Sequence, residues 1–125
     1  MQKLMSIKEF KALNNKPKKS KYRNVRTTVD GIVFDSKKEA ARYSELKLLE
    51  GAGIITNLQL QVKFILQNTT YIADFVYYIA NTSLGGKGWE YVVEDVKSAI
   101  TKKNPLYRLK KKMMLSMHGI EIKEV

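Results

Sequence analysis

Two apolar stretches, Tyr71-Ile-Ala-Asp-Phe-Val-Tyr-Tyr78 and Trp89-Glu-Tyr-Val-Val-Glu-Asp-Val-Lys97, decide the fold predicted for this sequence. Both are rich in β-branched and aromatic residues, have the length of strands, and are separated by a glycine-rich connection. Each carries carboxylates in an apolar setting: Asp74 in the first, Glu94 and Asp95 in the second. Because burying a carboxylate without a partner costs free energy, we expect these side chains to have one, and a metal ion is a candidate.

The alternation of side chains along a strand sorts these acidic residues. Asp95 and Lys97 are two residues apart, so they project from the same face, and Glu94 projects from the opposite face. We therefore interpret Glu94 as a structural residue or a water-bridged neighbour. Gln61 lies on the strand before Asp74 and can position water or backbone, although an exposed strand glutamine is the simpler interpretation.

Turn, capping and periodicity patterns predict further elements on both sides of these strands. In chain order they are a hairpin over 21–34 with its turn at Asp30-Gly31, a helix over 36–50, a strand over 57–66, a helix beginning at Asn104-Pro105, and a short strand over 120–125. The apolar residues of the second helix are expected to form its buried stripe: Leu106, Leu109, Met113 and Met117. The whole pattern predicts one domain of the α/β or α+β class.

Glu39, near the start of the first helix, has two interpretations. Ser36 can cap this helix, and Glu39 would then complete a capping box by reaching back to the Ser36 amide. Alternatively, Glu39 shares a helix face with Tyr43 and Leu46 and points toward the sheet. The residues by themselves favour the cap.

Composition excludes several classes of site. The chain has 125 residues and no cysteine, so it can form neither a disulfide framework nor a thiolate metal site. Its one histidine, His118, falls at the predicted end of a helix, which disfavours a zinc site, a Ser-His-Asp triad and a histidine-dependent nuclease. No apolar run approaches the roughly 18–20 residues of a membrane span, and lysines interrupt the N-terminal region, so a cytoplasmic protein is expected.

The net charge of +11 is unevenly distributed. Residues 1–26 hold nine basic and one acidic residue (+8), residues 27–99 hold seven and nine (−2), and residues 100–125 hold seven and two (+5). Two basic ends therefore flank an acidic middle, and such flanks attract a polyanion, with nucleic acid the expected partner. Residues 1–20 are expected to form a basic arm that can hold a short helix at its start.

The acidic middle can build a site for a divalent metal. Mg²⁺ prefers oxygen ligands and usually takes one or two protein carboxylates together with substrate phosphate. Asp74 and Asp95 would supply the carboxylates, and the Val96 carbonyl would supply a third oxygen. Lys97 would orient the attacking water or stabilise charge that develops on a phosphoryl group.

A helix acid followed by Asp74 and then Asp95-x-Lys97 resembles the PD-(D/E)xK nuclease superfamily. Three segments are similar to a small branch found mostly in phages and prophages: Phe34-Asp-Ser-Lys-Lys-Glu-Ala-Ala-Arg-Tyr43, Tyr71-Ile-Ala-Asp-Phe75 and Val93-Glu-Asp-Val-Lys97. The resemblance covers about residues 20–125. Ala73 stands where the superfamily name has Pro, a variation that leaves the metal chemistry untouched.

This resemblance implies an αβββαβ restriction-endonuclease-like core with a mixed sheet, preceded by the basic arm and the hairpin, with residues 21–125 as a single nuclease-like domain. It also implies dependence on Mg²⁺ or Mn²⁺ and hydrolysis of DNA. Asp74 and Asp95 carry over as metal ligands and catalytic residues, and Lys97 carries over as the catalytic lysine. Glu39 carries over as the helix acid and a further metal ligand. The resemblance therefore favours the active-site interpretation of Glu39 over the capping interpretation.

The resulting hypothesis is a metal-dependent DNA endonuclease that acts on phage replication, recombination or packaging DNA, including branched DNA, in a bacterial host. The residues expected to contact the DNA are Lys18, Lys19, Lys21, Arg23, Arg26, Arg108, Lys111 and Lys112. One alternative is a nuclease-fold protein that does not cut but binds nucleic acid or a host protein. RNA is a weaker alternative substrate, and a homodimer would allow a domain this small to cut both strands.

Overall fold

The computed structural model describes residues 25–81 and 88–125. Its elements, in chain order, are β1 (Thr27–Val29), β2 (Ile32–Phe34), α1 (Lys37–Gly51), β3 (Ile55–Ile65), β4 (Thr70–Asn81), β5 (Gly88–Asp95), α2 (Ala99–Lys102), α3 (Pro105–His118) and β6 (Lys123–Glu124). The predicted basic arm over 1–20, with its helix, lies outside the described residues.

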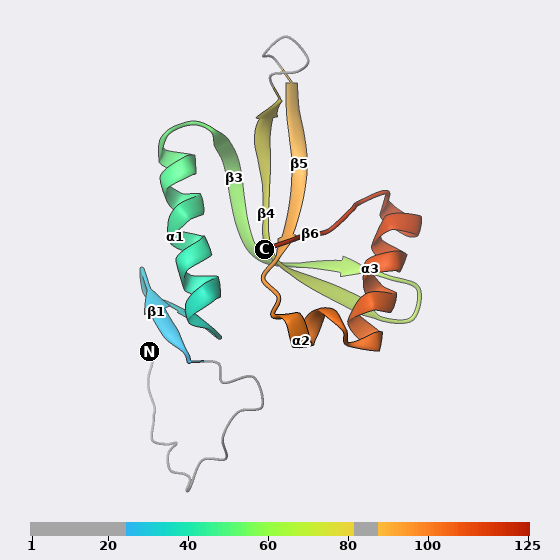
Figure 1. Ribbon diagram of the computed structural model, residues 1–125. Coiled ribbons are helices and arrows are strands. Elements are labelled where there is room, and N and C mark those ends of the chain that lie inside the picture. The colour runs from blue at the N-terminus through green and yellow to red at the C-terminus, as the bar shows by residue number, and fades with distance from the viewer. Residues whose placement is uncertain (1–24, 82–87) are drawn as a thin grey trace, which may run out of the picture.

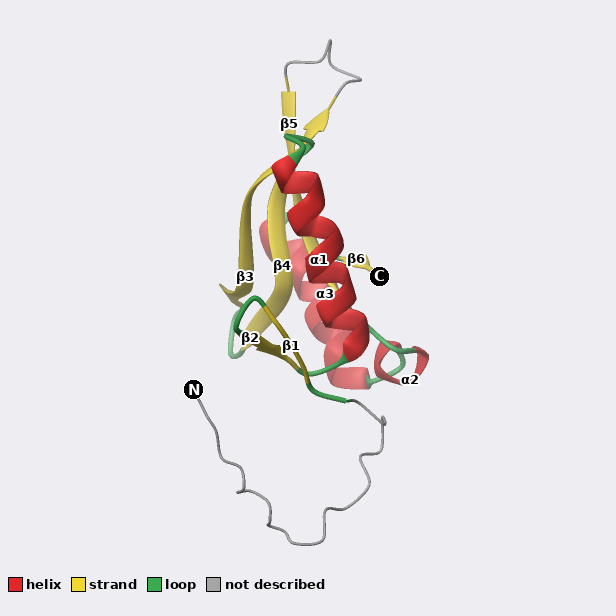
Figure 2. Cartoon of the chain, turned by 90° about the vertical axis from the view of Figure 1, so that its left-hand side faces the viewer, coloured by secondary structure: helices red, strands yellow, loops and turns green. Residues whose placement is uncertain are grey.

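The main sheet has four strands in the order β3-β4-β5-β6. Its first two pairings are antiparallel, and β5 pairs with β6 in parallel, so the sheet is mixed. β1 and β2 form a separate hairpin beside the beginning of α1 (Figure 1). Figure 2, viewed from the α1 side, has α1 in front of the sheet and α3 behind it. The predicted α+β class with a mixed sheet is confirmed.

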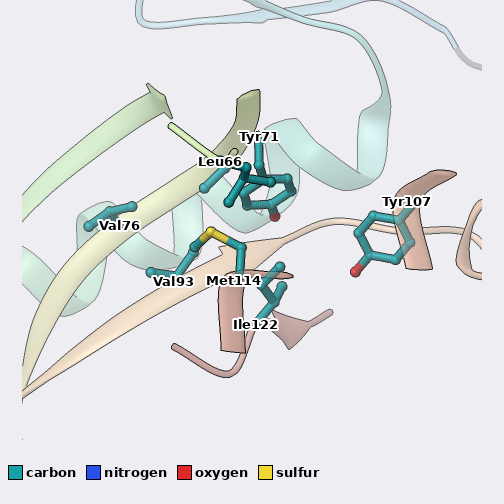
Figure 3. Close-up of a cluster of buried hydrophobic side chains, with 8 residues drawn as sticks. Leu66, Tyr71, Val76, Val93, Tyr107, Met114 and Ile122 are labelled. Atoms are coloured by element: carbon teal, nitrogen blue, oxygen red, sulfur yellow. The ribbon is translucent and has the colours of Figure 1, made fainter. Parts of the chain in front are cut away.

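Two buried clusters hold α1 and α3 to the sheet. The first packs α1 and the β1–β2 hairpin and consists of Phe34, Ala40, Tyr43, Leu46, Ile55, Phe75 and Tyr77. The second packs α3 and the C-terminal segment and consists of Leu66, Tyr71, Ala73, Val76, Val93, Tyr107, Met114 and Ile122 (Figure 3). Burial of these apolar side chains is the main stabilising contribution to such a domain.

The β3–β4 hairpin bends sharply toward α3 in its lower half (Figure 1). In a flat strand, odd-numbered residues would keep one face. Here Phe75 belongs to the α1 cluster and Ala73 to the α3 cluster. Their partners on β3, Leu60 and Val62, pack against the same two clusters. Asp74 therefore lies at the point where the hairpin passes from one core to the other.

Most predicted elements are present, with small shifts at their ends. The turn residues Asp30 and Gly31 both have positive φ (54° and 76°), as expected of a two-residue hairpin turn. β3 begins two residues before the predicted strand, and its pairing with β4 shifts register near Asn57, which has φ 60°. The short helix α2 was not predicted. No helix within the described ranges is both long and apolar enough to cross a membrane.

The predicted buried stripe of the second helix is wrong. Leu106, Leu109 and Met117 of α3 are exposed, and Met113 is partly buried. The helix instead buries Tyr107 and Met114, which lie on an adjacent side. Helical spacing identifies candidate stripes, but the neighbours that cover α3 determine which one is buried.

Candidate active site

Asp74 and Gln61 face each other across the bend of the β3–β4 hairpin. The flanking pairs Leu60–Phe75 and Val62–Ala73 set this register. Gln61 has φ 53°, a left-handed conformation that is uncommon for a residue other than glycine and carries strain. Its Nε2 lies 3.3 Å from Asp74 Oδ1. Gln61 is thus exposed, as the simpler interpretation expected, but it is also a contact of the acidic site.

Of the two arrangements that the sequence allowed for Glu39, the structure has the one in which its carboxylate points toward the sheet. Among the described residues no hydrogen bond runs from the Ser36 amide to that carboxylate, so the predicted capping box is not completed. Ser36 caps α1 by accepting the Glu39 backbone N–H at 3.1 Å. The Glu39 carboxylate turns toward the sheet, where its Oε2 accepts from Gln61 Nε2 at 3.2 Å. One amide therefore links a carboxylate of α1 to the Asp74 carboxylate of β4.

β5 ends at Asp95, two residues before the end of the predicted strand, so Lys97 follows the strand; its side chain still lies on the same side as that of Asp95, as predicted. Lys97 Nζ is 3.4 Å from Asp95 Oδ1, and Tyr71 donates its hydroxyl to Asp95 Oδ2. Lys97 Nζ also sits 4.6 Å from the centre of the Tyr107 ring. Val96 lies between Asp95 and Lys97 in the chain, and its backbone N–H donates to Asp74 Oδ2 at 2.9 Å. These contacts connect β5 to the Asp74 side of the site.

Burial, together with the crowding of the three carboxyl groups, raises the pKa values of Glu39 and Asp95. Burial and then the nearby charges of Asp74 and Asp35 raise the pKa of Glu39 to about 7. Burial and then a hydrogen bond with Asp74 raise the pKa of Asp95 to about 7, against the lowering effects of Tyr71 and Lys97. Near neutral pH Glu39 and Asp95 are therefore partly protonated, which lessens the repulsion among the three carboxyl groups.

A cavity of about 240 Å³ opens at this cluster. Its wall includes the site residues Glu39, Asp74, Val96 and Lys97. Lys38 also lines it, and its Nζ donates to the Lys97 carbonyl oxygen at 3.1 Å. The cavity thus combines carboxylates with two ammonium groups, a combination suited to a cation together with a phosphate.

The donor set fits a hard divalent cation that takes part of its coordination from water or substrate. Within 25–81 and 88–125, no three His, Cys, Asp or Glu residues form a complete metal-binding group. Mg²⁺ does not require one, because it commonly uses one or two carboxylates and keeps several waters. Glu39 Oε2 and Asp74 Oδ1 converge on a single amide nitrogen, and Asp74 is near enough to Asp95 to help raise its pKa.

Glu94 lies on the opposite face of β5 from Asp95, as predicted. Its side chain is fully buried and accepts from Arg42 Nε at 2.8 Å and from Arg42 Nη2 at 2.6 Å. Tyr77 also donates its hydroxyl to Glu94. This network fastens α1 to the sheet, so Glu94 has a structural role.

The basic residues expected to contact DNA are not gathered at the acidic cavity. Four of them, Lys18, Lys19, Lys21 and Arg23, lie outside the described residues. Arg26 is exposed just before β1. The other three, Arg108, Lys111 and Lys112, line a separate cavity of about 320 Å³ beside the C-terminal segment. In that cavity Lys111 Nζ pairs with Glu124 Oε2 at 3.2 Å.

Sequence reasoning missed Lys38 and Tyr71. A signal for Lys38 was available, because a lysine in the first turn of a helix opposes the helix dipole and suggests another reason for its place. A signal for Tyr71 was its position on the same strand as Asp74, since a buried tyrosine hydroxyl needs a partner. The partner itself, Asp95, lies on β5 and could not be identified from spacing.

Glu39→Gln is expected to stabilise the folded protein at alkaline pH. In the folded state Glu39 keeps its proton up to a pKa of about 7, whereas an unfolded glutamate loses it near 4.5. Wild-type stability therefore falls as pH rises from 4.5 to 7, and glutamine avoids this loss. We expect the variant to gain about 1–3 kcal/mol at pH 8 and nothing at pH 4.5.

Urea denaturation in EDTA at both pH values measures this difference. Glu90→Gln is the matched control, since it removes an exposed carboxylate from β5, and it should change stability equally little at both values. A Glu39→Gln variant that is less stable than wild type at pH 8 would contradict the electrostatic account.

Comparison with known proteins gives a family. No curated protein and no solved structure matches the chain. One family model matches residues 19–123, a range that includes Glu39, Asp74, Asp95 and Lys97. The chain therefore belongs to the family described as "Protein of unknown function (DUF1064)".

Proposed function

We propose that this chain is a metal-dependent DNA endonuclease of the PD-(D/E)xK type. The observation that carries the proposal is the convergence of Glu39, Asp74 and Lys97 on one cavity, with Asp95 buried against it. Glu39 comes from α1, Asp74 from β4, Asp95 from the last position of β5, and Lys97 from the segment that follows β5. Their chemistry combines oxygen ligands for a cation with a positive charge for a phosphate.

The finer fold assignment is part of this proposal. The order α1, β3, β4, β5, α3, β6 agrees with the αβββαβ core of restriction-endonuclease-like proteins, with α2 as an addition. The parallel pairing of β5 with β6 gives the mixed sheet that such a core requires.

Asp74 and Asp95 would hold Mg²⁺ or Mn²⁺, with Glu39 and the Val96 carbonyl as further ligands. When bound, the ion supplies Lewis-acid polarisation of the scissile phosphate and a lower pKa for the attacking water. Tyr71 fixes the orientation of the Asp95 carboxylate by its hydrogen bond. Gln61 holds the Glu39 and Asp74 carboxylates toward each other.

Lys97 stabilises negative charge that develops on the phosphoryl oxygens, and Asp95 and the Tyr107 ring hold its ammonium group in place. Lys38 adds a second ammonium group to the same cavity.

The proposed substrate is DNA of a phage or prophage inside a bacterial cell. Arg26, Arg108 and Lys112 are exposed basic residues that can contact its phosphates. Such contacts position the duplex without reading its sequence, which agrees with a nuclease that selects a DNA structure.

A second candidate function is binding of nucleic acid without cleavage. The exposed basic residues Arg26, Arg108 and Lys112 favour it, because contacts with phosphates need no metal ion. In that case the basic surfaces would carry the function, and the carboxylate cluster would remain without a catalytic role.

Incubation of the full chain with linear duplex, single-stranded and four-way-junction DNA distinguishes the two functions. A matching RNA tests the remaining substrate class. The endonuclease proposal expects cleavage of at least one DNA in Mg²⁺ or Mn²⁺ and none in EDTA. Binding to these DNAs with no cleavage under any metal condition would instead support the second function.

A further inference from the structure

A second cavity adjoins the candidate active site and shares Lys97 with it. It has a volume of about 310 Å³ and lies between the beginning of β4 and α3. The residues of its wall that matter here are Thr70, Ile72, Lys97, Leu106, Tyr107 and Lys110. Because Lys97 also lines the acidic cavity, the two hollows are neighbours on the surface.

Lys97 is held where it can serve both hollows. Its ammonium group lies 3.4 Å from Asp95 Oδ1 and 4.6 Å from the centre of the Tyr107 ring. Tyr107 is itself fixed, since its hydroxyl donates to Glu124 Oε2 at 2.7 Å. A phosphate that occupies the acidic cavity would thus have the second cavity next to it along a polynucleotide strand.

The charge of the second cavity differs from that of the other cavities around the basic residues. Among the described residues no aspartate or glutamate lines it, whereas Glu121 and Glu124 line the cavity that contains Arg108. Lys110 forms no ion pair with any carboxylate in the described parts of the chain. Its ammonium group is therefore available to an anion, beside that of Lys97.

The rim of the cavity is apolar. Leu106 is 58% exposed and Ile72 is 48% exposed, although both are large aliphatic side chains. An inorganic anion gains no binding free energy from contact with such a rim. A nucleotide gains it, because its sugar and base can cover aliphatic and aromatic surface while its phosphate is paired with lysine.

We propose that this cavity binds the nucleotide next to the scissile phosphate, with its phosphate on Lys97 and Lys110 and its sugar and base against Ile72 and Leu106. The position relative to a cut rests on the proposed endonuclease function. The contact with a polynucleotide does not, so the two can be tested separately.

The test is the salt dependence of binding to a fluorescein-labelled single strand of about 12 nucleotides, a length within the range of single-strand sites. Fluorescence anisotropy of the full chain in EDTA, from about 50 to 200 mM NaCl, gives the slope of log affinity against log salt. Lys110→Gln should reduce the affinity about 5-fold and reduce the magnitude of this slope by about 0.7, the loss of one phosphate contact. Leu106→Ser should lower the affinity without changing the slope.

Lys47→Gln is the matched control, since it removes a lysine from α1 that pairs with Glu50 and lines neither cavity. An unchanged slope for Lys110→Gln, or the same change in both lysine variants, would overturn the subsite. If Lys110→Gln behaves as expected but wild type cuts no DNA in Mg²⁺ or Mn²⁺, the subsite stands and the endonuclease proposal fails. If wild type cuts DNA but the slope for Lys110→Gln is unchanged, the endonuclease proposal stands and the subsite fails.

Discussion

Asp74→Asn is expected to lower the rate of DNA cleavage by at least about 10³-fold, which corresponds to about 4 kcal/mol of transition-state stabilisation. Asp74 accepts from the Val96 backbone N–H and from Gln61, and it helps raise the pKa of Asp95. Asparagine has nearly the same shape but carries no charge to hold a cation. Its amide also presents a donor where the wild type has an acceptor.

The DNA affinity of Asp74→Asn should not fall with its cleavage rate. Removal of a negative charge from the cavity lessens repulsion of the phosphates, so the variant should bind DNA as tightly as wild type or more tightly. A merely structural role for Asp74 would instead lower cleavage and binding together. Rates with excess enzyme, together with anisotropy in EDTA, separate these effects.

Glu90→Gln is again the control, because it neutralises an exposed carboxylate of the neighbouring strand β5. It should leave the cleavage rate within about 2-fold of wild type, as expected of a surface change far from the site. Asp74→Asn that cuts at the wild-type rate would remove Asp74 from the proposed mechanism.

The strand pattern could be predicted from local sequence because alternation is a local property. It assigned Asp95 and Lys97 to one face of β5 and Glu94 to the other, and the contacts of Glu94 with Arg42 and of Asp95 with Lys97 agree. The partners themselves come from other elements. Arg42 lies 52 residues before Glu94 in the chain, and no spacing rule connects them.

Gln61 illustrates a second reason why part of the site could not be predicted. A flat strand would direct its side chain by simple alternation, away from any partner on α1. The bend of the hairpin and the positive φ of Gln61 instead bring its amide to both Glu39 and Asp74. At the bend the hairpin passes between two separate hydrophobic cores, one packed against α1 and the other against α3. Long-range packing also determines that α3 buries Tyr107 and Met114 instead of the apolar stripe predicted from spacing.

Arg42→Ala is expected to destabilise the fold by about 3 kcal/mol near pH 7, since removing one partner of a buried ion pair leaves an uncompensated charge. Glu94 has 0% exposure and loses two hydrogen bonds in this variant. It keeps the Tyr77 hydroxyl and Lys123, whose Nζ is 3.8 Å from Glu94 Oε2. These remaining contacts place the cost at the lower end of the range for buried pairs.

The pH dependence identifies the cause of the loss. Burial alone would raise the pKa of Glu94, but hydrogen bonds from Arg42 and Tyr77 outweigh it and lower the pKa below 4.5. In wild type, Glu94 therefore contributes stability above pH 4.5 that is lost as pH falls through its folded pKa. Without Arg42 the effect of burial dominates, so the cost of Arg42→Ala should shrink as pH falls toward 4.5 and Glu94 becomes protonated.

Urea denaturation of Arg42→Ala, Glu94→Gln and the double variant, each at pH 5 and pH 8, completes the test. The double variant should be more stable than Arg42→Ala at pH 8, because glutamine needs no counter-charge in the core. Lys47→Ala breaks an exposed pair on the same helix and should cause no measurable loss. If Arg42→Ala costs the same at both pH values, its effect comes from lost packing of the arginine stem and not from the buried charge of Glu94.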